Sequence, residues 1–99
     1  MKEGHIVRVV RLTFSKETID EFNDLYKKHE HDITSQPGCM KVDLVEDASN
    51  PYVRATISKW KDVDSLNSYR DSKLFGVVWP ATKALFSAKP EVWTYKTRS

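Results

Sequence analysis

The stretch Ile6–Phe14, IVRVVRLTF, sets the architecture of this chain, because it combines β-branched residues with enough length for a full strand. Side chains alternate along a strand, so the even-numbered residues from Arg8 share one face and the odd-numbered residues from Val7 share the other. Both faces are largely apolar, which is expected of a central strand that is covered on two sides. We therefore expect a layer of helices on one side of this strand and a second cover, such as a partner subunit, on the other.

The residues after this strand predict one helix and then a hairpin. Ser15 is expected to cap a helix with an apolar stripe, which ends before Gln36-Pro37-Gly38. The apolar stripe is formed by Ile19, Phe22, Leu25, Tyr26, His29 and Ile33. Two strands are expected over residues 39–46 and 52–60, and the turn chemistry of residues 47–51 joins them in a hairpin.

The last third of the chain predicts a second helical region and a closing strand. Asp62 is expected to cap a short helix with Val63, Leu66 and Tyr69 on its apolar side. A longer helical pattern runs over residues 74–86, and because Pro80 interrupts it, a kink or break is expected near Trp79. A short strand follows at residues 92–96. The order β-α-β-β-α-β predicts a ferredoxin-like α+β fold, with a four-stranded antiparallel sheet and its helices on one face. A second copy would cover the other face.

Composition places the chain among small globular proteins. Its 99 residues predict a single domain over residues 1–99, and the net charge of +2, without a basic stripe, argues against a nucleic-acid partner. No apolar stretch reaches the roughly 20 residues of a membrane span, and the first residues lack the apolar core of a secretory signal. We therefore expect a cytoplasmic protein without a membrane partner. The histidines and the single cysteine lack metal-ligand spacing, so no metal site is expected.

Four stretches carry a resemblance to a known family. They are the Pro37–Cys39 turn, Trp60 at the end of the third strand, the Tyr69–Phe75 step between helices, and Lys89–Trp93 near the end. With these stretches the chain resembles the antibiotic biosynthesis monooxygenases (the ABM family) from Val7 to Tyr95. The resemblance implies a homodimer, a dimeric α+β barrel in which two sheets pack face to face. It also implies a ligand pocket between the helices and the sheet of each subunit.

The resemblance also bears on activity. Some members are cofactor-free oxygenases that oxidise phenolic polyketides to quinones, whereas others degrade haem. The Asn, Trp and axial His of the haem-degrading members correspond to Val10, Tyr69 and Trp79. An indole nitrogen is only a donor, so Trp79 cannot ligate iron and haem degradation is disfavoured. The quinone-forming members have a Trp that matches Trp60, but their Asn four residues earlier is Thr56 here.

We therefore predict a monooxygenase that acts, without any cofactor, on a small aromatic or quinol-like metabolite. A non-catalytic, ligand-binding homodimer of the same fold is the alternative, because Thr56 and Trp79 replace residues of the known activities. The residues expected to bind the ligand are aromatic residues suited to stacking and polar residues of the third strand. They are Trp60, Tyr69, Trp79, Thr56, Phe75 and Arg54. At helical spacing, however, aromatic residues belong to an ordinary core more often than to a binding site, and the polar residues of the third strand fit a structural role as well as a pocket.

His29 is the candidate catalytic residue. It lies on the apolar stripe of the first helix, and an imidazole suits proton transfer near neutral pH. The alternative is a core histidine whose ring nitrogens are satisfied by neighbouring groups, as buried polar groups usually are. Whether its ring enters the pocket separates the two interpretations.

Overall fold

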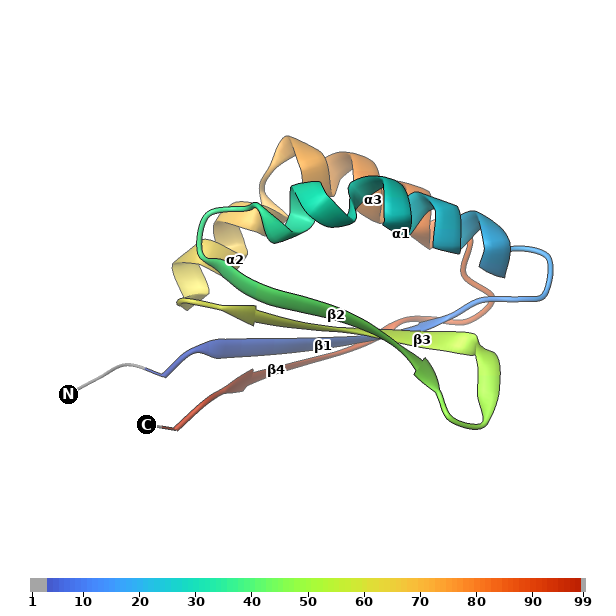
Figure 1. Ribbon diagram of the computed structural model, residues 1–99, viewed down its shortest axis with the longest axis horizontal. Helices are drawn as coiled ribbons and strands as arrows, with labels where there is room; N and C mark the ends of the chain where they lie inside the picture. The colour runs from blue at the N-terminus through green and yellow to red at the C-terminus, as the bar shows by residue number, and fades with distance from the viewer. Residues whose placement is uncertain (1–3, 99) are drawn as a thin grey trace.

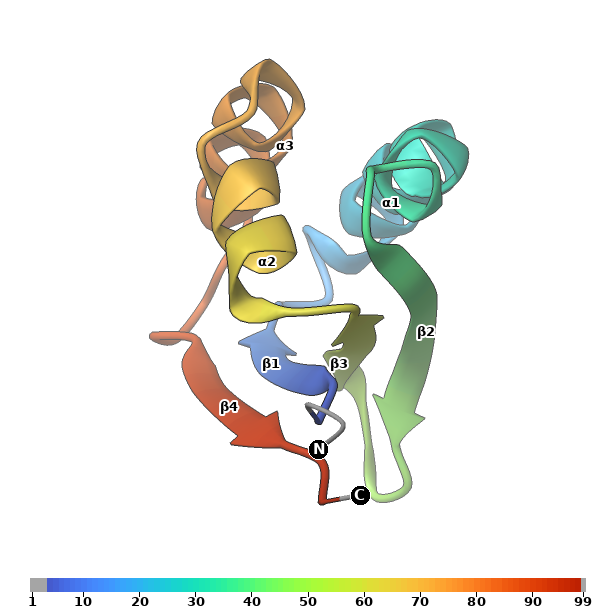
Figure 2. The same ribbon diagram turned by 90° about the vertical axis from the view of Figure 1, so that its left-hand side faces the viewer.

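The computed structural model describes residues 4–98, and it has the predicted α+β, ferredoxin-like architecture. One sheet carries all of the helices on one face (Figure 1). Its elements, in chain order, are β1 Ile6–Thr13, α1 Ile19–Thr34, β2 Cys39–Asp47, β3 Asn50–Trp60, α2 Val63–Arg70, α3 Lys73–Lys83 and β4 Glu91–Lys96. The end-on view separates α1 on one side from α2 and α3 on the other, all above the sheet (Figure 2).

The sheet is antiparallel, with the strand order β2-β3-β1-β4. Directly paired residues point to the same side of a sheet, so the register defines two faces. The inner face, below the helices, contains rows such as Val42–Ser58–Arg8 and Leu44–Thr56–Val10. The outer face contains the row Asp43–Ile57–Val9–Trp93, together with the pair Val7–Tyr95.

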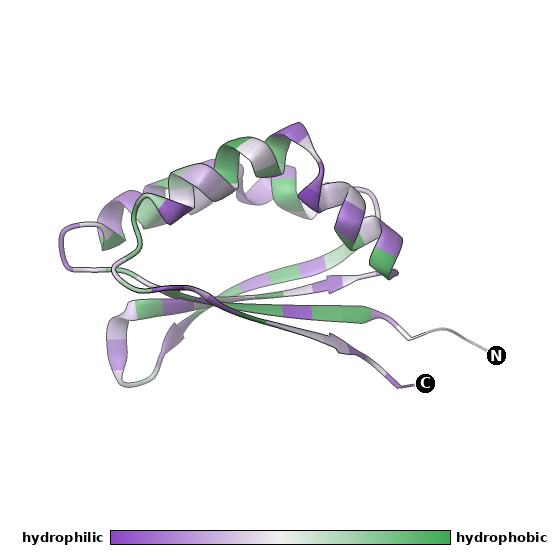
Figure 3. Ribbon diagram, turned by 180° about the vertical axis from the view of Figure 1, so that it is seen from behind, coloured by the Kyte–Doolittle hydropathy of each residue, from purple (hydrophilic) through white to green (hydrophobic). Residues whose placement is uncertain are grey.

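Two groups of buried residues join the helices to the inner face. One is built around Phe14, directly after β1, and Phe22 of α1. Their rings stack with the centroids 4.3 Å apart. The other is built around Trp60, which is only 1% exposed, and includes Leu66 of α2. Figure 3 shows hydrophobic residues alternating with hydrophilic ones in both layers, as amphipathic elements require.

The N-cap of α1 differs from the prediction. Thr18 occupies this position, three residues after Ser15. Residues 15–18 form a turn in which the amide of Ile19 donates to the carbonyl of Ser15 at 3.0 Å. The hydroxyl of Thr18 donates instead to the carbonyl of Leu85, at 2.9 Å. This bond ties the start of α1 to the segment that follows α3, so a tertiary contact decides where the helix begins.

The hairpin is confirmed, but its turn is shorter than predicted, since β2 reaches Asp47 and β3 starts at Asn50. Both turn residues bond locally: the Asp47 carboxylate accepts from the amide of Ser49 at 3.0 Å, and the Asn50 side chain accepts from the amide of Tyr52 at 3.0 Å. Such bonds hold a tight turn, so the strands continue up to it.

Gly38 is required where α1 passes into β2. Its φ is +80°, and a Cβ there would lie 2.1 Å from the Oγ of Ser65 in α2. Its carbonyl accepts from the amide of Lys61 at 2.8 Å. Only glycine combines this backbone conformation with so close an approach. The turn therefore holds the start of α2 against the sheet, as Asp62 caps that helix by accepting from the amide of Ser65 at 2.8 Å.

The longer helix shows two differences from the prediction. It continues through Pro80, which contradicts the break but not the kink, and it ends at Lys83 instead of reaching Phe86. Proline removes only the bond to the carbonyl of Gly76, and Gly76 is exposed, so water can satisfy that carbonyl. Val63 is also exposed at 51%, although it was expected on the apolar side of the short helix.

The chain ends of the described region meet beside each other (Figure 1). The amide of His5 donates to the Oγ1 of Thr97 at 2.8 Å, and the amide of Thr97 donates to the carbonyl of His5 at 2.8 Å. This clasp continues the pairing of β1 with β4.

None of the helices between residues 4 and 98 has the length and hydrophobicity that crossing a bilayer requires. The cytoplasmic location stays a prediction.

Candidate functional site

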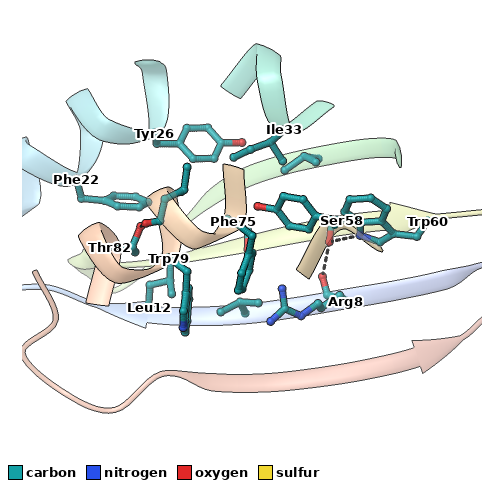
Figure 4. A pocket seen from close by; sticks show the side chains of 15 residues that line it. Arg8, Leu12, Phe22, Tyr26, Ile33, Ser58, Trp60, Phe75, Trp79 and Thr82 are labelled. Carbon is teal, nitrogen blue, oxygen red and sulfur yellow. Dashed lines mark hydrogen bonds between the residues drawn. The ribbon is translucent and has the colours of Figure 1, made fainter. Parts of the chain in front are cut away.

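A pocket lies between the inner face of the sheet and the helices (Figure 4). It holds about 590 Å³ of empty space, its opening to solvent included. Its floor comes from the inner faces of β1, β2 and β3, and its walls come from α1 on one side and from α2 and α3 on the other. The lining residues are Arg8, Val10, Leu12, Phe22, Tyr26, Ile33, Val42, Thr56, Ser58, Trp60, Tyr69, Phe75, Val78, Trp79 and Thr82.

The floor of the pocket is locked by a short chain of hydrogen bonds. The indole Nε1 of Trp60 donates to the Oγ of Ser58 at 3.0 Å, and that hydroxyl donates to the backbone carbonyl of Arg8 at 3.4 Å. The chain links β3 to β1 and satisfies the buried indole N–H (Figure 4). The polar residue Ser58 on the helix side of β3 therefore has a structural partner as well as a place in the pocket.

One wall is a continuous series of aromatic rings. Trp60 stacks on Tyr69 with centroids 5.1 Å apart, and Tyr69 meets Phe75 edge-on at 5.2 Å. Phe75 then stacks on Trp79 at 5.8 Å, and Trp79 meets Phe86 edge-on at 5.8 Å. The series runs from β3 through α2 and α3 to Phe86 in the segment after α3. It offers flat apolar surfaces of the kind against which an aromatic ligand stacks.

Two tyrosines bring hydroxyl groups to the pocket, and both stay protonated near neutral pH. Burial raises the pKa of Tyr26 to about 12, and burial raises the pKa of Tyr69 to about 12. The hydroxyl of Tyr26 is buried and has no hydrogen-bond partner within residues 4–98. A phenol with such a pKa can donate a hydrogen bond to a ligand oxygen, but it does not act as a base at neutral pH.

Arg8 is the one charged side chain among the fifteen that line the pocket. Burial lowers its pKa, and the nearby charge of Arg70 lowers it further. Within the described residues, the guanidinium has no carboxylate at ion-pair distance. Sequence reasoning placed Arg8 on one face of its strand with the other even-numbered residues but did not single it out as a site residue.

Comparison with known proteins shows to which family the chain belongs. The profile of the family described as antibiotic biosynthesis monooxygenase matches residues 5–78, which is more than half of the chain. The protein belongs to the antibiotic biosynthesis monooxygenase family. Among curated proteins, no sequence matches it significantly.

Solved structures agree with the family in fold. A conserved protein from Methanosarcina mazei Go1 has a TM-score of 0.91 at 22% identity, over 96% of this chain and 94% of that one. A structure named antibiotic biosynthesis monooxygenase has a TM-score of 0.87 at 20% identity, over 95% and 99%. The protein Rv0793 from Mycobacterium tuberculosis has a TM-score of 0.88 at 14% identity, over 96% of each chain. At these identities the likeness shows the fold alone.

Five of the six residues predicted to bind the ligand line the pocket of this family member. They are Trp60, Tyr69, Trp79, Thr56 and Phe75. Arg54 is not among the lining residues. Its guanidinium lies 3.4 Å from a carboxylate oxygen of Glu46, and it also donates to the carbonyl of Pro51. The pairing of β2 with β3 sets Glu46 directly opposite Arg54 and so provides this partner.

His29 is not among the lining residues either. It is half-buried on α1, and its Nδ1 is buried without a hydrogen-bond partner within residues 4–98. Tyr26, one turn earlier on the same apolar stripe, does line the pocket. Sequence reasoning named the stripe correctly but selected His29 because imidazole chemistry suits proton transfer. Spacing along the helix gave no signal that would have favoured Tyr26.

Residues that the resemblance sets at the positions of the haem-degrading and quinone-forming members also line this pocket. Val10, Tyr69 and Trp79, which the resemblance sets at the positions of the haem-degrading members, all line it. None of the three offers an iron ligand of the imidazole kind. Trp60 and Thr56, at the positions of the quinone-forming members, share the floor of the same pocket. The site is therefore apolar and aromatic, with a few polar groups.

Proposed function

We propose that the protein is a cofactor-independent monooxygenase that acts on a small aromatic, quinol-like metabolite. The observation that carries this proposal is the series of aromatic rings, from Trp60 to Trp79, along an apolar pocket. A flat substrate would stack on these rings, and a few polar groups would orient it. Membership of the antibiotic biosynthesis monooxygenase family supports an oxygenase in particular.

Such a reaction uses dioxygen as its oxidant and takes the electrons from the substrate. A phenol whose tautomer carries a ring methylene loses a proton, and its anion passes one electron to dioxygen. The radical pair forms a C–O bond and takes up a proton, which gives a hydroperoxide. Loss of water breaks the O–O bond and the remaining C–H bond and leaves a carbonyl. The methylene and one dioxygen molecule thus become a carbonyl and one water molecule, so no external reductant is consumed.

The pocket offers this reaction hydrogen-bond donors. Tyr26 and Tyr69 are protonated near neutrality, since burial raises the pKa of each to about 12. They would donate to a substrate oxygen and favour its anionic form. Thr56 would supply a further hydroxyl at the floor. The walls would exclude water from the anion and its radical.

The catalytic role of His29 stays a prediction with its own test. Its free Nδ1 could accept a proton, but the ring would have to reach the substrate from outside the described lining. If His29 is the base, His29→Ala will lower oxygen uptake and leave ligand binding unchanged. Unchanged oxygen uptake in this variant would contradict the role.

The test of the oxygenase is oxygen uptake with a panel of phenols, hydroquinones and anthrone-like compounds. Uptake above the blank, with formation of the carbonyl product, is expected. It should fall in Trp60→Phe, which reshapes the wall, and remain in Trp93→Phe, because Trp93 lies on the outer face. Lack of uptake with every compound would contradict the oxygenase.

The alternative is a non-catalytic homodimer that binds small aromatic ligands. It is favoured by Thr56 in place of the Asn of quinone-forming members. Binding without turnover would appear as ligand-induced quenching of tryptophan fluorescence in the absence of oxygen uptake. Trp60→Phe and Trp79→Phe should each reduce this quenching, whereas Trp93→Phe should preserve it.

A homodimer is part of both functions. Apolar side chains stand exposed on the outer face: Ile57 is 36% exposed, Trp93 40% and Tyr95 56%. A second sheet packed on this face would bury them, as the family resemblance implies, and exposed apolar patches of this kind often mark interfaces. Sedimentation should give twice the monomer mass, and a stable monomer at micromolar concentration would overturn this proposal.

A further inference from the structure

Arg8 is the unusual group of the pocket, because its charge is set among apolar and uncharged side chains. The pocket lining contains no Asp or Glu. The guanidinium rises from β1 at the floor, beside Phe75 of α3 (Figure 4). Burial lowers the pKa of Arg8, and Arg70, another cation, lowers it further. The surroundings within the subunit therefore oppose the charge, and a bound anion would favour it.

The other two arginines of the strands, Arg11 and Arg54, differ from Arg8 in that each has a carboxylate partner. Arg11, on the outer face, lies 3.3 Å from a carboxylate oxygen of Asp47 and 3.8 Å from one of Glu91. Arg54, on the inner face, lies 3.4 Å from Glu46. Among the described residues, Arg8 alone of these three has neither a carboxylate at such a distance nor a hydrogen-bond acceptor for its guanidinium. Arg8 is half-buried, and a charge withdrawn from water normally has a partner.

The remaining polar groups of the pocket differ in whether they already have a hydrogen-bond partner within the protein. The hydroxyl of Ser58 accepts from Trp60 and donates to the Arg8 carbonyl, and the hydroxyl of Thr82 donates to the carbonyl of Val78 at 2.7 Å. The guanidinium of Arg8 and the hydroxyl of Tyr26 are left without partners within residues 4–98. Figure 4 shows Tyr26 on α1 above the pocket and Arg8 on β1 below it. Free donors thus stand above and below the pocket.

The geometry points to a ligand that is an aromatic acid: a flat ring whose anionic oxygen, from a carboxylate or an ionised phenol, binds the Arg8 guanidinium while the ring lies along Tyr69 and Phe75. This inference rests on the proposed function, in that the pocket must hold an aromatic ring. It adds the charge of that ring and the residue that selects it. Charge-assisted bonds to a guanidinium are the strong class of hydrogen bond and suit both oxygen sources.

The first experiment compares two ligands that differ only in charge. 2-Naphthoate and its neutral analogue 2-naphthamide are titrated against the full-length protein, with tryptophan quenching as the readout. The naphthoate should bind at least about tenfold more tightly. Equal binding would overturn the role of Arg8 and leave the aromatic pocket intact. Failure of both to bind would contradict the aromatic pocket itself, and this inference with it.

Variants at Arg8 locate the effect. Arg8→Met keeps the length of the side chain and should abolish the preference for naphthoate, whereas Arg8→Lys keeps the charge and should retain part of it. Arg70→Gln is the matched control, since it removes a neighbouring cation that does not line the pocket. If Arg70→Gln abolishes the preference as fully as Arg8→Met does, a general field explains it, and the specific contact is wrong.

A phenol tests the second oxygen source, an ionised phenol. Its readout is the pKa of the bound phenol, which a purely structural role of Arg8 would not change. Bound 4-nitrophenol should ionise at lower pH than the free compound, because Arg8 stabilises the phenolate. In Arg8→Met the apolar pocket should instead raise the pKa of the bound phenol. If the pKa of 4-nitrophenol rises on binding to the wild-type protein, the proposal is wrong for phenols and holds only for carboxylates. If, in addition, 2-naphthoate and 2-naphthamide bind equally well, the proposal is wrong for both oxygen sources.

Thermal unfolding provides the remaining check. Loss of a half-buried, unpaired charge removes an unfavourable interaction, so Arg8→Met should unfold at the same temperature as the wild type or higher. A marked fall in Tm would show that Arg8 mainly supports the packing of Tyr69 and Phe75, and it would count against a binding role.

Discussion

The inner and outer faces of the sheet use the same four strands for opposite purposes. Inner residues such as Val10 and Leu12 are at most 4% exposed and pack under helices, whereas outer residues such as Ile57 and Trp93 are 36% and 40% exposed. Both faces carry apolar side chains, but among the described residues the half-buried cation without a protein partner, Arg8, lies on the inner one. Apolarity alone therefore does not locate a binding site. The informative residue is the polar group that packing leaves unsatisfied.

The largest effect is expected from a pair of substitutions, one on each face. Trp60→Ala should lower the free energy of unfolding by about 3–5 kcal/mol, because Trp60 is 1% exposed and its removal leaves a cavity. Trp93→Ala should cost less, and its cost should depend on protein concentration if a partner covers the outer face. Chemical denaturation at two protein concentrations measures both. Equal costs that do not vary with concentration would show that the two faces do not differ in this way.

A charge on the outer face tests what covers it. Ile57→Lys should weaken the dimer by about 2 kcal/mol or more, roughly thirtyfold in its dissociation constant, because a lysine would be buried without a partner. Val77→Lys is the matched control, since Val77 is 59% exposed but lies on α3 in the helix layer. Sedimentation velocity over a dilution series gives both constants. A dimer that tolerates Ile57→Lys as well as Val77→Lys would require another interface.

A smaller effect concerns the free hydroxyl of the inner face. Tyr26→Phe removes a buried hydroxyl that has no partner within residues 4–98, and it should raise the free energy of unfolding by about 1 kcal/mol, while ligand affinity falls. Tyr95→Phe, on the outer face, should leave ligand affinity unchanged, because Tyr95 does not line the pocket. Denaturation and tryptophan quenching give the two quantities. A loss of stability in Tyr26→Phe would mean that its hydroxyl is already satisfied in the protein.

The smallest effect is a pH dependence in the helix layer. Hydrogen bonds from the hydroxyl and amide of Ser65 hold the pKa of Asp62 below its ordinary value of 3.8. The folded state therefore favours the ionised form, and this stabilisation is present at neutral pH and is lost as the pH falls below about 4. The Tm should fall on acidification, and less steeply in Asp62→Asn. A wild-type slope in Asp62→Asn would contradict this role of Asp62.

Alternation and turn residues were enough to predict most of the fold. IVRVVRLTF specified a central strand with two apolar faces, and Pro37-Gly38 and the residues around Asn50 marked turns that the structure contains. The N-cap of α1 was not predictable in the same way. The hydroxyl of Thr18 finds its acceptor in Leu85, 67 residues away, and no local pattern contains that contact.

The site was predicted in its aromatic wall but not in its charge. Arg8 and Arg54 are the same residue type on the same face, and sequence reasoning selected Arg54. The register separates them, since it sets Glu46 opposite Arg54 but sets Ser58 and Thr94 opposite Arg8. Strand register is a property of the assembled sheet. The partner of a charged residue, or its lack of one, therefore becomes visible only in three dimensions.

The clasp between His5 and Thr97 has a consequence for how the molecule yields to force. β1 and β4 are antiparallel, and their clasped ends lie at the same end of the sheet. Tension applied through the two termini would therefore load one hydrogen bond at a time, like a zipper, instead of shearing all of them together. β4 contributes no residue to the pocket lining, so it could peel away first while the floor and the aromatic wall stayed assembled.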